Sequence, residues 1–129
     1  MQNKNPPEQQ LNIFGEPIKI CSNNPITGFF RDGCCNTDLT DSGSHTVCAE
    51  MTTEFLAFSK LNGNDLSTPR PEFGFEGLKD GDRWCLCAGR WLEAAKEGKA
   101  PLIAGESTHQ ASLTIIPEAS LMKHLIKLN

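Results

Sequence analysis

The sequence lacks the features that assign many proteins to a membrane or to a nucleic acid. No apolar run approaches the ~20 residues that a membrane-spanning helix needs, so we predict no membrane partner. The first ten residues are polar and contain no apolar core, so we expect no secretory signal and a cytoplasmic location. The net charge of −4 argues against a nucleic-acid partner, because phosphate binding needs a basic face.

Two common site motifs are also missing. No Cys-x-x-Cys pair occurs, although that spacing is typical of zinc knuckles and of redox dithiols. The glycines match no phosphate-binding loop. What the chain does contain is six cysteines in 129 residues. Because cytoplasmic thiols stay reduced, we expect no disulfides and consider these cysteines as buried thiols, metal ligands or redox thiols.

The apolar patterning predicts an α+β fold, with a small sheet packed against three or four helices and long irregular loops rich in Cys, Gly and Pro. Residues 1–10 are predicted to be a disordered tail, and residues 11–129 a single domain. The clearest helix is residues 53–61, begun by a threonine cap and stopped at Gly63, with Leu61 on its core face. A second helix is expected over residues 118–128, after Pro117.

Shorter elements are expected elsewhere in the chain. The patterns predict strands at residues 17–21, 45–49, 102–104 and 114–116, and a short helix at 109–113 capped by Thr108. Residues 22–50 are otherwise a long irregular region, of a kind that is usually functional or pinned in place.

The segment around the two tryptophans has two interpretations. Trp84, Cys87 and Trp91 fall at helical spacing, which favours a helix starting at Asp82 and ending near Glu97. The alternative is a strand over residues 84–87 with a helix from about residue 88. The choice matters because only a strand or a turn lets Cys85 and Cys87 approach one metal ion.

The first functional hypothesis is a metal site, with zinc as the cofactor. Zinc takes four ligands, usually thiolates and imidazoles, and the spacing of His45 and Cys48 suits one half of such a site. The candidate ligands are Cys34, Cys35, His45, Cys48, Cys85 and Cys87.

The second hypothesis is thiol redox or nucleophilic chemistry. A reactive cysteine needs an electropositive and partly exposed setting, and two adjacent cysteines follow Arg31. A histidine would act as the base. The candidate catalytic residues are Cys34, Cys35, His45 and His109.

The third hypothesis is a non-enzymatic module that binds an anionic metabolite or an acidic peptide. All four arginines lie between positions 31 and 90, and the arginine fork suits bidentate recognition of anions. The alternative is that these arginines form structural ion pairs and that the cysteines only pack. The candidate ligand-binding residues are Arg31, Asp32, Asn64, Asp65, Arg83 and Arg90.

Several strings in the middle of the chain resemble one known family, catalogued as domain of unknown function 2237. The strings are Thr27-Gly28-Phe29-Phe30-Arg31-Asp32-Gly33-Cys34-Cys35, His45-Thr46-Val47-Cys48, Glu54-Phe55-Leu56-Ala57-Phe58-Ser59, Gly63-Asn64-Asp65-Leu66-Ser67-Thr68-Pro69, Gly81-Asp82-Arg83-Trp84-Cys85-Leu86-Cys87 and Thr108-His109. The resemblance runs from about residue 12 to residue 124 and departs from the family pattern at Asp80-Gly81 and at Phe75-Glu76-Gly77. It implies a small bacterial-type α+β domain, and it implies no activity.

Overall fold

The computed structural model describes residues 9–127, so most of the predicted tail lies outside the described residues. Within this range the chain forms a two-stranded sheet and three α-helices, with three short 3₁₀ helices. The α+β class is therefore confirmed. The sheet is smaller than a typical α+β sheet, and the helices are at the lower end of the expected number.

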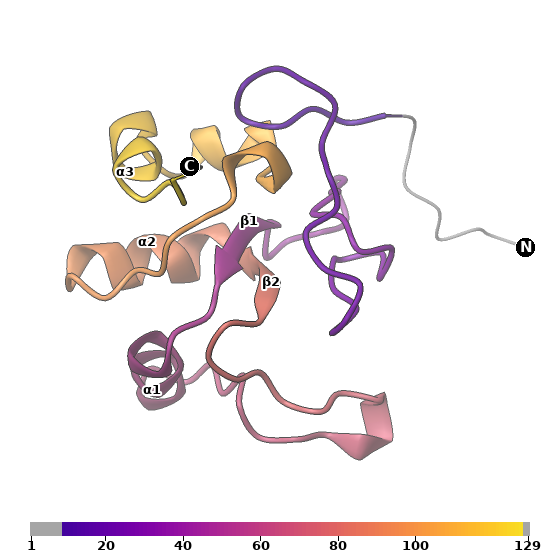
Figure 1. Cartoon of the computed structure of the whole chain (residues 1–129), viewed down its shortest axis with the longest axis vertical. Coiled ribbons are helices and arrows are strands. Elements are labelled where there is room, and N and C mark those ends of the chain that lie inside the picture. Colours follow the sequence, from indigo (N-terminus) through magenta and orange to yellow (C-terminus); the bar gives the residue numbers. More distant parts are fainter. Residues whose placement is uncertain (1–8, 128–129) are drawn as a thin grey trace, which may run out of the picture.

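The two strands are antiparallel and lie at the centre of the molecule (Figure 1). Strand β1 spans His45–Glu50 and β2 spans Arg83–Cys87. Helix α2, Ala88–Lys96, follows β2 without a loop. The strand interpretation of this segment is thus correct, and the favoured helix from Asp82 is wrong. Residues 84–86 are all buried, so both faces of β2 are covered and the alternation that marks a strand is hidden.

The three α-helices pack on one side of the sheet, and the irregular N-terminal segment lies on the other (Figure 1). Helix α1 spans Thr53–Leu61 and is capped by the Thr52 side chain, which accepts from the backbone N–H of Phe55. Helix α3 spans Glu118–Lys123, shorter than expected. The main core on this side contains Val47, Phe55, Leu86, Trp91 and Leu121. Leu61 was predicted to join it but is 87% exposed, because it lies at the last turn of α1.

Three of the expected strands do not form. Residues 17–21 and 102–104 contribute only isolated bridges, such as Leu11 with Pro17 and Ala49 with Ile103. Residues 114–116 complete a 3₁₀ helix, Gln110–Thr114, and the turn after it. This element replaces the short helix predicted at 109–113, and His109 rather than Thr108 caps it by accepting from the N–H of Ala111. Short apolar runs therefore packed as buried irregular segments, since no further strand offered a partner.

Two disulfides tie the irregular segment to the sheet, contrary to the expectation that all cysteines are reduced. Cys21 is bonded to Cys48 of β1, and Cys35 is bonded to Cys85 of β2. All four cysteines are buried. The long irregular region is therefore pinned covalently, which explains how so little secondary structure holds it in place.

None of the helices within residues 9–127 has the length and apolar character to cross a membrane. The cytoplasmic location and the single domain over residues 11–129 stay predictions.

Candidate functional site

A bulge in the sheet brings a histidine opposite a free cysteine. Cys48 pairs with Cys85 and Val47 with Leu86, so a regular ladder would place Thr46 opposite Cys87. The register instead shifts, and His45 is the partner of Cys87. A bulge inserts one residue and turns the next side chain to the other face. The bulge therefore places the His45 side chain on the same face of the sheet as the Cys87 side chain.

The extra residue of this bulge, Thr46, is held by the buried segment at its back. Its carbonyl accepts from the N–H of His109, and its hydroxyl accepts from Ser112 Oγ at 2.8 Å. Thr46 and Ser112 are fully buried. Hydrogen bonds therefore hold the backbone next to His45 in place, although His45 is the first residue of its strand.

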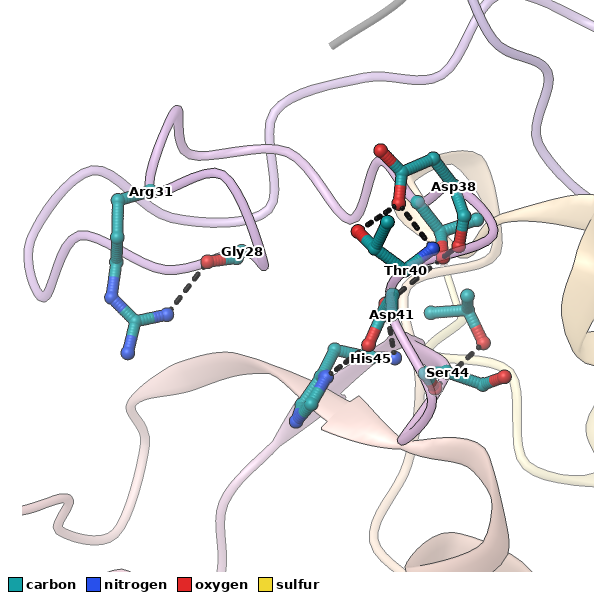
Figure 2. A network of polar contacts seen from close by, with 9 residues as sticks. Gly28, Arg31, Asp38, Thr40, Asp41, Ser44 and His45 are labelled. Carbon is teal, nitrogen blue, oxygen red and sulfur yellow. Dashed lines mark hydrogen bonds and ion pairs between the residues drawn. The ribbon is translucent and has the colours of Figure 1, made fainter. Parts of the chain in front are cut away.

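A buried carboxylate fixes the imidazole ring. Asp41 Oδ1 lies 2.7 Å from His45 Nδ1, and Asp41 Oδ2 accepts from the backbone N–H of His45 at 2.9 Å. Thr37 Oγ1 donates to the same Oδ2. Figure 2 shows Asp41 beside His45, at the turn that leads into β1. The Asp41 side chain is 0% exposed, so these donors replace its water, and Nε2 is the ring nitrogen left for Cys87.

His45 has the most strongly raised pKa of the site. A side-chain hydrogen bond with Cys87 is the largest cause, and burial opposes it by disfavouring the charged ring. The hydrogen bond and negative charge of Asp41 add to the rise, so the pKa of His45 reaches about 9. The ring is therefore protonated at neutral pH.

Cys87 lies where β2 ends and α2 begins. It occupies the N-cap position of α2, and none of the described side chains caps that helix end. The first N–H groups of a helix have no intrahelical acceptor and carry a partial positive charge. The N–H of Ala88 donates to Ser44 O, which leaves those of Gly89 and Arg90 for other acceptors. Both the helix end and His45 thus favour negative charge near the Cys87 sulfur.

The cysteine and the histidine open into a cavity of ≈ 270 Å³. Its walls combine aromatic rings, a guanidinium and an amide: Phe29, Arg31, His45, Asn64, Leu66, Trp84, Cys85, Leu86 and Cys87. The Phe29 ring stacks on His45 with centroids 6.2 Å apart. Gly43 closes the turn beside this pair, since a Cβ there would lie 2.8 Å from His45 Cε1 and 3.3 Å from Cys87 Sγ. The geometry is that of a cysteine, a histidine and an aspartate in series, at the edge of a small cavity.

The model of one protein family covers nearly all of this chain. The family described as "Uncharacterized protein conserved in bacteria (DUF2237)" matches residues 11–125. The chain belongs to this family. The matched range contains all six cysteines, together with Asp41 and His45. No curated protein matches the chain in sequence. The family resemblance seen in the sequence is thereby confirmed, and since the description names no activity, the function of this DUF2237 chain has to be argued from its site.

Among the arginines named as ligand-binding candidates, only Arg31 lines the cavity beside Cys87 and His45. Its guanidinium lies over the Trp84 ring, 5.2 Å from the centroid, and its Nη1 donates to Gly28 O (Figure 2). Arg83 pairs with Glu50 at 3.7 Å. Arg90 donates to Asn62 O and pairs with Glu93.

Of the polar candidates of this DUF2237 chain, Asn64 lines the cavity and the two aspartates hold turns. Asp32 accepts from the N–H of Cys34 and from Asn36. Asp65 accepts from residues 67 and 68, and the hydroxyl of Thr68 is the main cause that lowers the pKa of Asp65 to about 2.

The other catalytic candidates lie in settings that differ from that of Cys87. Cys34 is a free thiol, but burial and then the Asp32 carboxylate raise the pKa of Cys34. Cys35 is disulfide-bonded. The His109 ring accepts from Ala111 and contacts Gln10 at 2.6 Å, while burial lowers the pKa of His109. His45 is therefore the candidate base that has a free thiol as its partner.

The candidate metal ligands do not lie together. Cys35, Cys48 and Cys85 belong to the disulfides, His45 and Cys87 are partners at the bulge, and Cys34 is a free thiol elsewhere. Within residues 9–127, the only group of at least three His, Cys or carboxylate ligands close enough for one ion is Cys21, Cys35 and Cys85. Cys48 adjoins this group through its bond to Cys21. Cys21 was not among the candidates, because no nearby motif marked it in the sequence.

Asp41 was also missed. In the sequence it is one of several turn-forming residues between 36 and 44. The available signal was its position four residues before a histidine, in a segment where a backbone turn could bring the carboxylate back to the ring. The sequence indicates Cys87 as a metal ligand or a resolving thiol and not as the nucleophile, since its place at a helix N-terminus depends on the strand interpretation.

Proposed function

We propose that this protein is a thiol-dependent enzyme in which Cys87 is the nucleophile. The observation that carries the proposal is the series Cys87, His45 and Asp41, in which the imidazole has a buried carboxylate on one side and a free thiol on the other. His45 holds the thiol proton, and Asp41 orients the ring as a positioning residue. A histidine paired with a cysteine in this way is the arrangement that activates cysteine nucleophiles.

The reaction class that suits these groups is acyl transfer to water. The Cys87 thiolate adds to the carbonyl carbon of an ester or thioester. The carbon–oxygen or carbon–sulfur bond to the leaving group then breaks, and the leaving group takes the proton from His45 Nε2. Water attacks the resulting Cys87 thioester, gives its proton back to His45 and releases a carboxylic acid. The N–H groups of Gly89 and Arg90 belong to the first turn of α2, where backbone donors have no intrahelical acceptor, and are suitable donors for the oxyanion that forms at each addition.

The cavity favours a small acyl group with a polar end. Phe29 and Trp84 supply apolar area, whereas Arg31 and Asn64 supply hydrogen-bond donors. A volume of ≈ 270 Å³ is near the lower limit of ordinary ligand pockets. We therefore infer a substrate with a short acyl chain that carries a carboxylate or a carbonyl group for Arg31 to bind.

Selective alkylation tests the nucleophile. The chain has two free thiols, Cys34 and Cys87, so Cys34 is an internal control. At pH 7 iodoacetamide should modify Cys87 at least about tenfold faster than Cys34, measured by peptide mass spectrometry. His45→Gln should slow the Cys87 reaction by about tenfold and leave the Cys34 reaction unchanged. The proposal would be rejected if the two thiols were alkylated at equal rates, or if His45→Gln left the Cys87 alkylation rate unchanged.

Activated esters test the reaction class. Short-chain p-nitrophenyl esters should release a burst of nitrophenol and leave an acyl adduct on Cys87, detected by intact mass. Cys87→Ala should abolish both, and Cys34→Ala should retain both. An adduct on Cys34, or none on wild-type protein, would show that Cys87 is not an acyl acceptor.

A further inference from the structure

We propose that the reduced protein holds a divalent zinc-type ion between the four cysteines that form the two disulfides: Cys21, Cys35, Cys48 and Cys85. This site is separate from the thiol of Cys87, and its failure would leave the proposed enzyme untouched. It goes beyond the metal set expected from the sequence, because it contains Cys21 and excludes His45.

The sheet points two of these sulfurs towards the same place. Cys48 and Cys85 are opposite each other in the β1–β2 ladder, so their side chains leave the same face of the sheet. On that face they meet Cys21 and Cys35 of the irregular segment. Each strand therefore supplies one sulfur, and the irregular segment supplies the other two.

The spacing of the sulfurs is close to that of a tetrathiolate site. The Sγ atoms of Cys21, Cys35 and Cys85 all lie within 4.8 Å of one another. Zinc–sulfur bonds of about 2.3 Å in a tetrahedron place the sulfurs about 3.8 Å apart. Cys35 is bonded to Cys85 and Cys21 to Cys48, and a disulfide holds its two sulfurs about 2 Å apart. After reduction, the sulfurs of each pair have to move apart by about 1.8 Å to reach the tetrahedral spacing.

Burial favours a closed structural site rather than an open one. The four cysteines are between 0% and 6% exposed, and Ile18 and Ala104 pack around them. Reduction of the two disulfides would remove the covalent links between the sheet and the irregular segment. A bound ion restores these links, so the same packing is compatible with an oxidised state and a metal-bound state.

A dithiol can act as the reductant that converts the disulfide form into the metal-bound form. Two dithiol molecules reduce the two disulfides to four thiols and are themselves oxidised to two cyclic disulfides. One divalent ion then binds four thiolates and releases four protons. In the reverse direction, two molecules of a low-molecular-weight disulfide oxidise the four thiolates to the two protein disulfides, are themselves reduced to four thiols with protons from water, and the ion is released. The site would therefore report the thiol–disulfide balance of its surroundings.

Cobalt(II) is the probe, because a tetrahedral thiolate site gives it an intense visible spectrum. The protein is reduced anaerobically with a dithiol, freed of reductant, and titrated with cobalt and then with zinc. We expect one cobalt per chain, a tetrathiolate spectrum and its loss on zinc addition. Protein with both disulfides intact should show no such spectrum.

Two variants assign the ligands. The double variant Cys34→Ser/Cys87→Ser removes both free thiols and should bind cobalt as the wild type does. Cys85→Ser should lose the tetrathiolate spectrum. If Cys85→Ser does not fold, the wild type and the double variant decide the matter. Absence of cobalt binding by reduced wild-type protein, or its loss in the double variant, would overturn the proposal.

Discussion

At the scale of single residues, the site depends on the carboxylate of Asp41. This side chain is fully buried and accepts from the His45 ring, from the His45 backbone and from Thr37. A buried carboxylate stays charged only when donors of this kind replace its water. Its charge is in turn part of what keeps the His45 ring protonated. Asp41 does not line the cavity, but through His45 it influences the charge beside Cys87.

We expect Asp41→Asn to lower the pKa of His45 from about 9 towards its ordinary value of 6.5. The sign follows from linkage. A raised folded-state pKa means that protonated His45 stabilises the fold below pH 6.5, and that this contribution is lost as pH rises through 9. Asp41→Asn should therefore be less stable than the wild type below about pH 9, with the full difference below pH 6.5. Its Cys87 should also be alkylated more slowly at pH 7.

NMR titration of the His45 ring and denaturation at several pH values check this expectation. Asp82→Asn is the matched control, since Asp82 also accepts in a turn but pairs with Lys79. It should leave the His45 titration unchanged. A His45 titration that is the same in Asp41→Asn and wild type would contradict the role given to Asp41.

At the scale of elements, the joint between strand and helix places the thiol. β2 runs directly into α2, and Cys87 is the last residue of one and the cap of the other. The turn before β1 completes the site, because Gly43 lies against both His45 and Cys87. The β2–α2 joint and the turn before β1 thus place the sulfur and the ring beside the same residue, Gly43.

We expect Gly43→Ala to slow Cys87 alkylation and to lower the free energy of unfolding by about 1–3 kcal/mol. The added Cβ would lie 2.8 Å from His45 Cε1, so the ring has to move away from its place. Gly89→Ala is the matched control, because a Cβ there meets nothing within 4 Å. It should stabilise α2 by about 0.5–1 kcal/mol and retain the alkylation rate. Equal effects of the two substitutions on alkylation would show that the Gly43 contact is unimportant.

The sequence allowed some elements to be predicted and hid others for physical reasons. Helix α1 has a threonine cap, an amphipathic face and a glycine stop, all of which are local signals. The strand β2 has both faces buried, so its pattern is as compatible with a helix as with a strand. The bulge that pairs His45 with Cys87 cannot be recognised in the sequence, because threonine is common in regular strands. The hydrogen bonds of Thr46 to His109 and Ser112 join residues far apart in the chain.

At the scale of the whole molecule, the disulfides replace the secondary structure that the N-terminal third lacks. The described residues before β1 contain neither a helix nor a regular strand, and they pack on the sheet through Cys21 and Cys35. Pairing between residues 27 and 50 positions apart cannot be read from one sequence. The expected cytoplasmic location also argues against any pairing, so the sequence gives no reason to separate bonded cysteines from free ones.

We expect Cys21→Ala/Cys48→Ala to lower the free energy of unfolding by about 2–4 kcal/mol, because the unfolded chain regains the entropy of a loop. Chemical denaturation without reductant measures the change. Cys34→Ala, which removes a free thiol, should change stability by no more than about 1 kcal/mol. A small loss in the double variant would mean that packing alone holds the irregular segment.

The two disulfides also overlap along the chain, because Cys35 lies inside the loop closed by Cys21 and Cys48, and Cys48 lies inside the loop closed by Cys35 and Cys85. Every peptide bond between residues 21 and 85 is therefore enclosed by at least one covalent ring. A protease that cuts once at an exposed tip in this span, such as the one at Leu39 or at Phe73, produces a nicked molecule and no separate fragment. The oxidised protein would migrate as one intact chain after such a cut, and its two pieces would part only when the disulfides are reduced.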